Sequence, residues 1–197
     1  ENIAARQLLT GTSINGVRYS TYKYRTDKRV QESGLAGGEE KDTFTYATNQ
    51  TTVTSVAGQP VTYTFTSAQG ALAIASVSRA ATSSCAAANA KTYYDAYGWV
   101  DYTLDWNGNK TDYSYDAAGK LMQVTTAAGT ASAATRVNTW TGSNLTTVTY
   151  RDANASAYAK VVYTYATGSA AGRLASETWS DLRVGGTRTT SYAYAFH

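Results

Sequence analysis

The sequence contains one histidine and one cysteine among its 197 residues, and these scarcities exclude several kinds of site. The histidine, His197, is the last residue, which excludes Ser-His-Asp and Cys-His arrangements and histidine-based metal sites. The cysteine, Cys85, cannot form an internal disulfide. It lies in the small-residue stretch ATSSCAAANA, so we expect a plain thiol rather than a nucleophile.

Charged residues and long apolar runs are also scarce. Charged residues make up 16% of the chain, below the typical value of about 25%. The net charge is +3, and the charged residues are scattered along the chain and form no basic patch, so we expect no nucleic-acid partner. No apolar run approaches the length of about 20 residues that a membrane span needs. The glycines fit neither a dinucleotide-binding nor a P-loop pattern, so we expect no cofactor.

The abundant residues are those that favour strands. The chain has 17 tyrosines, with many threonines and valines. Branched and aromatic side chains pack well on a pleated sheet. The composition therefore predicts an all-β protein.

An aromatic-x-aromatic pattern recurs along the chain. Residues two apart in a strand point to the same face, so each pair places two rings on one side of a sheet. Several pairs precede a glycine-bearing turn and then Leu or Ile, which indicates a β-hairpin of about 20 residues. The pairs are Tyr22/Tyr24, Phe44/Tyr46, Tyr63/Phe65, Tyr113/Tyr115, Tyr163/Tyr165 and Tyr192/Tyr194.

This pattern predicts strands along the whole chain, in a single region covering residues 1–197. We expect a loop at 34–41, a loop or short helix at 79–91, and a short helix at 1–10. The expected strands are 17–25, 42–48, 51–57, 61–67, 71–78, 91–95, 99–104, 109–116, 119–126, 135–141, 144–151, 158–166, 173–181 and 186–196.

The stretch YDAAG at 115–119 explains how one hairpin turns. Tyr115 ends a strand, and the carboxylate of Asp116 can accept a main-chain N–H group in the turn. Gly119 supplies the positive φ that the turn requires. The stretch YDAYG at 94–98 repeats this motif 21 residues earlier.

At these residues the chain resembles the YD repeats of the RHS (rearrangement hotspot) family. The repeat reads roughly Asp-x-Asn-Gly-Asn, then Tyr-x-Tyr-Asp, two variable residues and Gly-Arg-Leu. The central copy matches at Asp105, Asn107, Gly108, Asn109, Tyr113, Tyr115, Asp116, Gly119 and Leu121, with Lys120 in place of arginine. Flanking copies match at Tyr94, Asp95 and Gly98, at Tyr163, Tyr165, Gly172, Arg173 and Leu174, and at Tyr63, Gly70 and Leu72.

The resemblance implies a non-enzymatic structural module. YD repeats of that family form β-sheets that spiral into a shell, which encloses a toxic C-terminal domain in secreted bacterial members; teneurins use a similar barrel on animal cells. A closed shell needs many more repeats than 197 residues hold. We therefore interpret the chain as an extended, curved section of such a sheet, part of a longer secreted or cell-surface protein. The implied partners are the remainder of that chain or an enclosed toxin domain.

Other interpretations of the same residues stay open. Asp105, Asn107, Asn109 and Asp116 have the spacing of a calcium loop, but Lys110 stands where that loop needs glycine, so we favour turn-capping carboxylates. A carboxylate pair for glycoside hydrolysis is conceivable, but nothing in the sequence singles out two carboxylates.

Carbohydrate binding is the alternative function. A sugar-binding face uses tyrosine and tryptophan rings, although such rings also pack between strands. The irregularly placed Trp99, Trp106, Trp140 and Trp179 are the expected ligand contacts on this interpretation.

A short section of sheet also exposes strand edges, so we expect homo-oligomers through edge pairing, unless Lys23, Arg25 and Lys28 protect the edge near the N-terminus.

Overall fold

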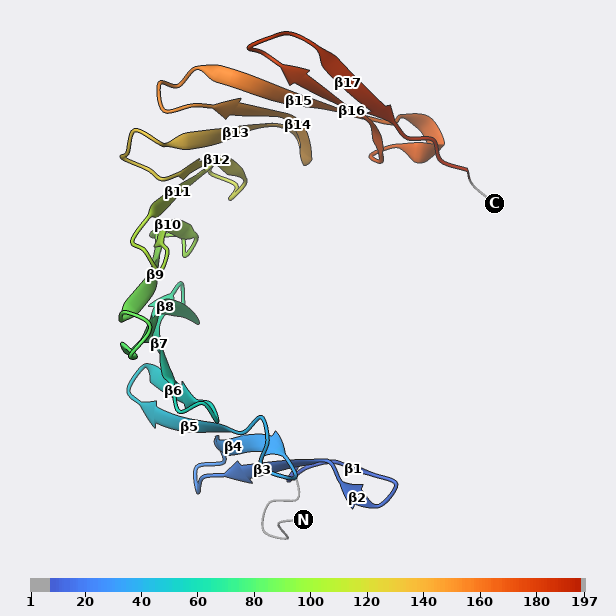
Figure 1. Ribbon diagram of the computed structural model, residues 1–197. Coiled ribbons are helices and arrows are strands. Elements are labelled where there is room, and N and C mark those ends of the chain that lie inside the picture. Colours follow the sequence, from blue (N-terminus) through green and yellow to red (C-terminus); the bar gives the residue numbers. More distant parts are fainter. Residues whose placement is uncertain (1–7, 196–197) are drawn as a thin grey trace. The chain divides into compact units, whose positions relative to one another are not determined.

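A computed structural model describes residues 8–195, and within that range the chain is made of antiparallel β-hairpins (Figure 1). Each strand pairs with its neighbour in the sequence, and the hydrogen-bonded order runs from β3 to β17 without a crossover. The chain divides into two compact units, residues 1–92 and 93–197. The predicted fold class, all-β with repeated antiparallel hairpins, is confirmed.

Unit 1 begins with a small separate hairpin and continues as the sheet. That first hairpin consists of two strands of two residues each, in which Ile14 pairs with Val17. The strands are β1 (Ser13–Ile14), β2 (Val17–Arg18), β3 (Ser20–Tyr24), β4 (Val30–Leu35), β5 (Asp42–Ala47), β6 (Gln50–Thr54), β7 (Pro60–Ala68), β8 (Ala71–Arg79) and β9 (Ala88–Tyr94), whose end crosses into unit 2.

Unit 2 continues the same pattern. Its one helical turn within the described residues is the 3-10 segment Gly168–Ala170. Among residues 8–195, no helix has the length and apolar character of a membrane span. The strands are β10 (Val100–Leu104), β11 (Lys110–Tyr115), β12 (Leu121–Thr126), β13 (Ala134–Thr141), β14 (Asn144–Arg151), β15 (Ala157–Tyr165), β16 (Leu174–Asp181) and β17 (Thr187–Ser191).

The sequence pattern missed one strand of the main sheet, β4. Its sequence, VQESGL, has three polar residues, a glycine and no aromatic ring, so it lacks the signal used elsewhere. The structure forms it because Tyr22 and Ser33 are paired across β3 and β4. Glu32 then bonds with Lys23 at 2.9 Å and Lys41 at 3.4 Å, and cross-strand pairing of this kind overrides local propensity.

The connections differ from the expectation in detail. The loop expected at 79–91 is shorter, because Ala88, Asn89 and Ala90 pair with β8 as the start of β9. Cys85 lies exposed in this loop. Most of the helix expected at 1–10 lies outside the described residues, and the described part, residues 8–10, is not helical.

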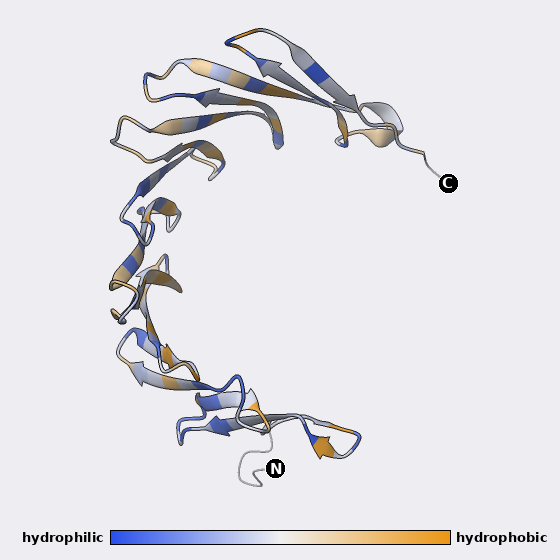
Figure 2. Ribbon diagram, viewed as in Figure 1, coloured by the Kyte–Doolittle hydropathy of each residue, from blue (hydrophilic) through white to orange (hydrophobic). Residues whose placement is uncertain are grey.

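The hairpins bury few side chains, because no second layer of strands or helices covers the sheet within either unit among residues 8–195. Figure 2 shows apolar and polar positions mixed along the strands rather than gathered into a continuous apolar segment. Among the described residues, the buried positions of unit 2, Asn138, Val148 and Val161, are successive cross-strand partners. Val161 is fully buried, and Val148 is 4% exposed.

The N-terminal edge of the sheet is covered by main chain. The carbonyl oxygen of Thr12 accepts bonds from the N–H groups of Tyr19 and Ser20, and that of Thr10 accepts from the N–H group of Tyr22. The strand edge of β3 is therefore protected by the preceding segment, and not only by charged side chains.

Candidate functional site

One turn geometry recurs between the strands of unit 2. In each case an aspartate begins the turn, and the N–H group three residues later donates to its carbonyl oxygen, at 2.9–3.1 Å. The aspartate N–H group donates in turn to the carbonyl oxygen four residues later. This is a type I turn followed by a residue of positive φ, a common hairpin connection. The turns are Asp95–Gly98, Asp105–Gly108, Asp116–Gly119 and Asp152–Ala155.

The aspartate side chains hold these turns closed. Oδ1 of Asp116 accepts the N–H groups of Ala118 and Lys120, both at 2.9 Å. The corresponding bonds at Asp105 come from Asn107 and Asn109. The predicted role of Asp116 as an acceptor of main-chain N–H groups is confirmed. Asp105 and Asp116 belong to two different turns, separated by β11, rather than to one loop.

The electrostatics of Asp105 agree with this geometry. The side-chain amide of Asn109 donates to Oδ2 at 2.8 Å, and main-chain N–H groups donate to Oδ1. The pKa of Asp105 is lowered chiefly by the Asn109 side chain and then by these N–H groups, since each favours the charged carboxylate. The motif Asp-x-Asn-Gly-Asn therefore builds a turn whose carboxylate is already occupied.

Gly119 has the predicted positive φ, 81°. The structure adds a packing reason for this glycine, because a Cβ there would lie 2.7 Å from Cζ2 of Trp99. Trp99 also stacks on Tyr97, with ring centroids 5.0 Å apart, and its ring centroid lies 5.3 Å from that of Tyr115. Burial raises the pKa of the Tyr115 hydroxyl.

A second recurring feature explains the last aromatic residue of several aromatic-x-aromatic pairs, namely Tyr46, Tyr165 and Tyr194. The strand register shifts between Thr164 and Tyr165, and Tyr165 then pairs with Leu174. A shift of this kind leaves a main-chain group without its ladder partner. The hydroxyl of Tyr194 donates to the carbonyl oxygen of Leu174 at 2.8 Å. An aromatic residue of one hairpin thus satisfies a carbonyl group at the register shift of the preceding hairpin.

The same contact occurs in both units. Tyr165 donates to Leu145 at 2.8 Å, and Leu145 is the partner of Trp140 at another register shift. Tyr46 donates at 2.7 Å to Val30, the partner of Tyr24 at the shift in β3. We call these contacts the aromatic–carbonyl bonds; each of them links one hairpin to the one before it.

Trp140 makes the indole version of an aromatic–carbonyl bond. Its Nε1–H group donates to the carbonyl oxygen of Leu121 at 3.0 Å, and Nδ2 of Asn138 donates to the same oxygen at 2.9 Å. Leu121 is the partner of Tyr115 at the register shift of β11. Trp140 therefore has a structural contact at the Leu position of the central repeat.

The four tryptophans have two kinds of environment. Trp99 and Trp140 are engaged with turns and strands of the sheet, as described above. Trp106 and Trp179 are 42% and 44% exposed. The ring of Trp179 lies parallel to that of Tyr150, at 6.0 Å between centroids, so one of its faces is supported by another ring.

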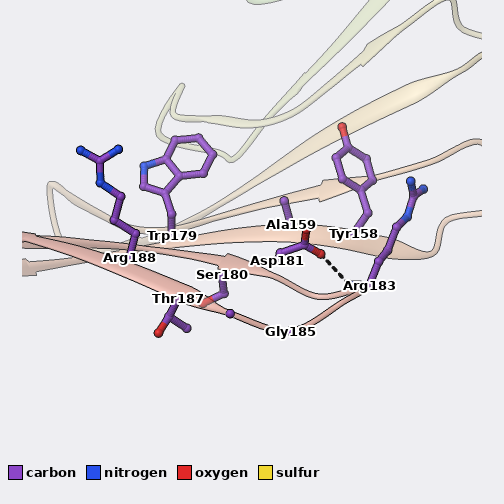
Figure 3. Close-up of a pocket in the computed structure, with 10 residues that line it drawn as sticks. Tyr158, Ala159, Trp179, Ser180, Asp181, Arg183, Gly185, Thr187 and Arg188 are labelled. Carbon is purple, nitrogen blue, oxygen red and sulfur yellow. Dashed lines mark hydrogen bonds between the residues drawn. The ribbon is translucent and has the colours of Figure 1, made fainter.

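Trp179 lines a hollow of about 560 Å³ between β15, β16 and the turn before β17. Figure 3 shows Trp179, Arg188 and Tyr158 projecting to one side of the strands, while Thr187 projects to the other. The guanidinium of Arg183 lies 4.8 Å from the ring centroid of Tyr158. The hollow therefore combines aromatic faces with arginine side chains.

A carboxylate completes one wall of this hollow. Oδ1 of Asp181 accepts the N–H groups of Arg183 at 2.8 Å and Val184 at 3.2 Å. These N–H groups lower the pKa of Asp181, because they stabilise its charged form. A neighbouring hollow of about 420 Å³ is lined by Tyr113, Arg136, Tyr150 and Tyr158, among others, so Tyr158 lies between the two.

The structure distributes the predicted motif residues along unit 2 and does not gather them into one pocket. Asp95, Asp105 and Asp116 lie at separate turns, and Tyr163 and Tyr165 lie on β15. Within residues 8–195, no three His, Cys, Asp or Glu side chains form a cluster that could hold a metal ion. The arrangement is that of a repeated structural unit, with Trp179 beside the larger hollow.

One copy of the turn escaped the sequence comparison. The stretch DANAS at 152–156 has alanine where the other three copies have glycine, so it lacks the Tyr-Asp-x-x-Gly signature. Its signal is the aspartate alone: Oδ1 of Asp152 accepts the N–H groups of Asn154 and Ser156 at 3.0 and 3.1 Å.

Comparison with known proteins identifies one segment of the chain. Residues 94–131, which contain the Asp95, Asp105 and Asp116 turns, match the sequence profile of the family described as RHS Repeat. No curated protein matches the chain.

Solved structures with a similar strand arrangement include a porin-like protein from Bacteroides uniformis ATCC 8492, at 15% identity and a TM-score of 0.40. That match covers 88% of this chain and 89% of the other. Two structures of TcdB2-TccC3, one without its hypervariable C-terminal region, give 14% and 13% identity and TM-scores of 0.44 and 0.43. These matches cover 76% and 94% of this chain, which spans only 10% and 12% of the TcdB2-TccC3 chains.

Proposed function

We propose that this chain, which carries an RHS repeat at residues 94–131, is a non-enzymatic structural module: a section of a repeat sheet that encloses another domain in a secreted or cell-surface bacterial protein. Its partners are then the remainder of a longer chain or an enclosed toxin domain. The proposal extends to the whole chain what its sequence resemblance implies for the matched segment.

The aromatic–carbonyl bonds are the observation that carries this proposal. They connect neighbouring hairpins at four places: Tyr46 with Val30, Trp140 with Leu121, Tyr165 with Leu145, and Tyr194 with Leu174. The aspartates of the repeat motif are occupied by turn hydrogen bonds, and Tyr165 is occupied by an aromatic–carbonyl bond. Side chains that serve the sheet itself support a structural role rather than a catalytic one.

The experiment is limited proteolysis of the product of the full reading frame. We expect the enclosed region to resist protease in the native protein. Deletion of the hairpin β11–β12, residues 110–126, removes the part of the central repeat from Tyr113 to Leu121 and should expose that region. If the deletion leaves the protease pattern unchanged in a protein that is still folded, the chain does not enclose the resistant region.

A second candidate function is carbohydrate binding, and the Trp179 hollow favours it. Apolar faces of sugars stack on aromatic rings, and Trp179 offers an exposed ring beside Arg188 and Tyr158. The volume of about 560 Å³ lies within the range of small-molecule sites, about 300–1,000 Å³.

A glycan array tests this second function on the purified chain. Trp179→Ala should abolish any glycan signal, whereas Trp106→Ala removes a ring of similar exposure outside both hollows and should leave it intact. Equal loss in both variants would show that the Trp179 hollow is not the site, and no signal from the native chain would leave the structural role alone.

A further inference from the structure

The smaller hollow of unit 2, of about 420 Å³, lies over a row of directly paired residues. Tyr113 pairs with Val124, which pairs on its other side with Arg136. Arg136 pairs in turn with Tyr150. Residues that lie opposite each other on neighbouring strands place their side chains on the same face of a sheet. Strands β10 and β15 flank this row on its two sides, so the hollow is bounded within the sheet. We call it the Arg136 hollow.

The charge of the Arg136 hollow is positive and unmatched. Its lining contains one charged side chain, that of the exposed Arg136, and no carboxylate. Among residues 8–195, Arg136 forms no ion pair. Glu177 lies on β16 opposite Tyr163 and does not line the hollow. Two N–H groups of a guanidinium can bond one carboxylate side by side, so the hollow suits a group of negative charge.

Three tyrosines give the hollow its aromatic rings. Tyr113, Tyr150 and Tyr158 line it, and each is half-buried. Within the part of the chain that the structure describes, their hydroxyls bond to no other group, whereas the hydroxyls of the aromatic–carbonyl bonds are occupied. The ring centroids of Tyr150 and Tyr158 lie 6.2 Å apart. These side chains therefore offer apolar ring faces and unused hydroxyl groups to a partner.

The opposite face of unit 2 satisfies its own polar side chains. Successive residues of a strand point to opposite faces, so Thr125 points away from the side of Val124. The hydroxyl of Thr125 pairs with that of Thr135 at 3.1 Å. The hydroxyls of Thr178 and Thr189 pair in the same way at 2.9 Å. The face that carries the Arg136 hollow is therefore the one with groups left for a partner.

We propose that the Arg136 hollow binds a polypeptide segment in which a carboxylate stands between apolar side chains. The carboxylate bonds to Arg136, and the apolar side chains pack on Tyr150 and Tyr158. A polypeptide fits because tyrosine, tryptophan and arginine contribute most of the binding energy at protein interfaces, and Trp179 extends this face beside Tyr150. The segment is acidic because the one charge of the hollow is positive. This inference rests on the proposed function, because the enclosed region is the source of the segment.

Peptide binding to the purified full chain tests the charge of the segment. The probe is a fluorescent peptide with the sequence Ser-Phe-Leu-Glu-Phe-Ser, and its matched control has glutamine in place of glutamate. We expect the glutamate peptide to bind at least about tenfold more tightly, measured by fluorescence anisotropy, since hydrogen bonds between charged groups are stronger than neutral ones. Equal binding of the two peptides would overturn the proposal.

Arg136→Gln should remove this preference. The glutamate peptide should bind this variant about tenfold more weakly, while the glutamine peptide binds it as before. Lys160→Gln is the matched control, because Lys160 and its partner Thr149 point to the opposite face and the variant loses the same charge. It should keep the preference, and circular dichroism checks that both variants remain folded. An equal loss in both variants would mean that net charge attracts the peptide, and the hollow would not be its site.

Competition separates a polypeptide from an acidic sugar, which carries the same charge. Unlabelled glutamate peptide should displace the probe at a lower concentration than tetragalacturonate does. If tetragalacturonate displaces the probe at the lower concentration, the hollow is a site for acidic sugars and the polypeptide occupant is wrong.

Two results would separate failure of this inference from failure of the proposed function. A native chain that does not distinguish the two peptides rejects the acidic segment and leaves the structural module standing. Peptide binding through Arg136, combined with an unchanged protease pattern after deletion of residues 110–126, rejects enclosure and leaves the peptide site standing.

Discussion

In unit 2, four turns that share the same main-chain bonds begin with an aspartate whose Oδ1 accepts main-chain N–H groups, whereas the Arg25–Lys28 turn of unit 1 begins with an arginine. Both kinds of turn have the same main-chain bonds: Lys28 donates to Arg25 at 3.0 Å, and Arg25 donates to Arg29 at 2.9 Å. Lys28 has a φ of 68°, at the position that Gly98, Gly108 and Gly119 occupy in unit 2. The backbone therefore adopts this turn without the motif residues.

The two units also differ in what they bury. The buried apolar side chains among the described residues, Val148 and Val161, both lie in unit 2, while unit 1 buries the hydroxyl-bearing Ser20. In unit 1, Glu32 on β4 forms ion pairs with Lys23 on β3 and with Lys41 before β5. The Asp-x-x-Gly signature marks the better-packed unit, and this difference can be tested by substitution.

The largest effect is expected at Gly119. Gly119→Ala forces a Cβ to 2.7 Å from Trp99 and places alanine at positive φ. We expect it to lower the free energy of unfolding by about 2–4 kcal/mol, measured by urea denaturation. Gly108→Ala is the matched control, because Gly108 has a φ of 82° and no atom within 4 Å of the added Cβ. Its cost should be about 1 kcal/mol. Equal costs would mean that Trp99 does not constrain the turn.

The next effect concerns the buried row of unit 2. Val161→Ala removes methyl groups from a fully buried site and should cost about 2 kcal/mol in the free energy of unfolding. Val53→Ala is the corresponding change in unit 1, at a half-buried site on β6. It should cost less than about 1 kcal/mol. A larger cost at Val53 would contradict the difference in packing between the units.

Removal of one aromatic–carbonyl bond should have a smaller effect. Tyr165→Phe leaves the carbonyl of Leu145 without the hydroxyl that bonds it at 2.8 Å. We expect a loss of about 0.5–1.5 kcal/mol, with faster amide exchange in β14 and β15. Tyr163→Phe, on the same strand, is the control and should be near neutral. If the two substitutions cost the same, the bond to Leu145 contributes nothing.

The sequence predicted the parts of this architecture that depend on side-chain type. Alternating rings, Asp116 and Gly119 indicated the strands and the turn, because branched and aromatic residues favour strands and positive φ favours glycine. The aromatic–carbonyl bonds were not predicted, since their acceptors are main-chain carbonyls exposed by register shifts, which any residue can supply. β4 and the Asp152 turn were missed for the same reason: pairing with neighbours forms them despite weak local signals.

Salt should change the pKa values of carboxylates in the two units by different amounts. The pKa of Glu32 is lowered chiefly by hydrogen bonding from Lys23, whereas the pKa of Asp105 is lowered chiefly by the uncharged Asn109 side chain. Both values are lower in the folded chain than in the unfolded chain. Each carboxylate therefore stabilises the fold above its unfolded pKa, and this stabilisation is lost as pH falls through the folded pKa, below about 4.

Carboxyl pKa values measured by NMR at low and high salt provide the comparison. High salt should raise the pKa of Glu32 toward its ordinary value, because it screens the lysines. The pKa of Asp105 should change less, since its partners carry no charge. A shift of the same size at both residues would indicate that charge, and not turn hydrogen bonding, controls Asp105.

The smallest expected effect comes from placing glycine in the two turns that lack it. Three turns of unit 2 already have glycine at this position. Lys28 and Ala155 have φ values of 68° and 60° in turns with the same main-chain bonds as Gly119. Lys28→Gly and Ala155→Gly relieve a left-handed conformation that costs about 1–2 kcal/mol. Each also gives the unfolded chain more freedom, which removes about 0.4–1 kcal/mol. We therefore expect a net gain of about 0.5 kcal/mol in each case, measured as a higher urea midpoint.

Lys28→Ala is the control, because it shortens the side chain but keeps the strained φ, and it should give no gain. If Ala155→Gly stabilises unit 2 while Lys28→Gly destabilises unit 1, the Lys28 side chain itself supports its turn, and the two units differ in more than their signature residues.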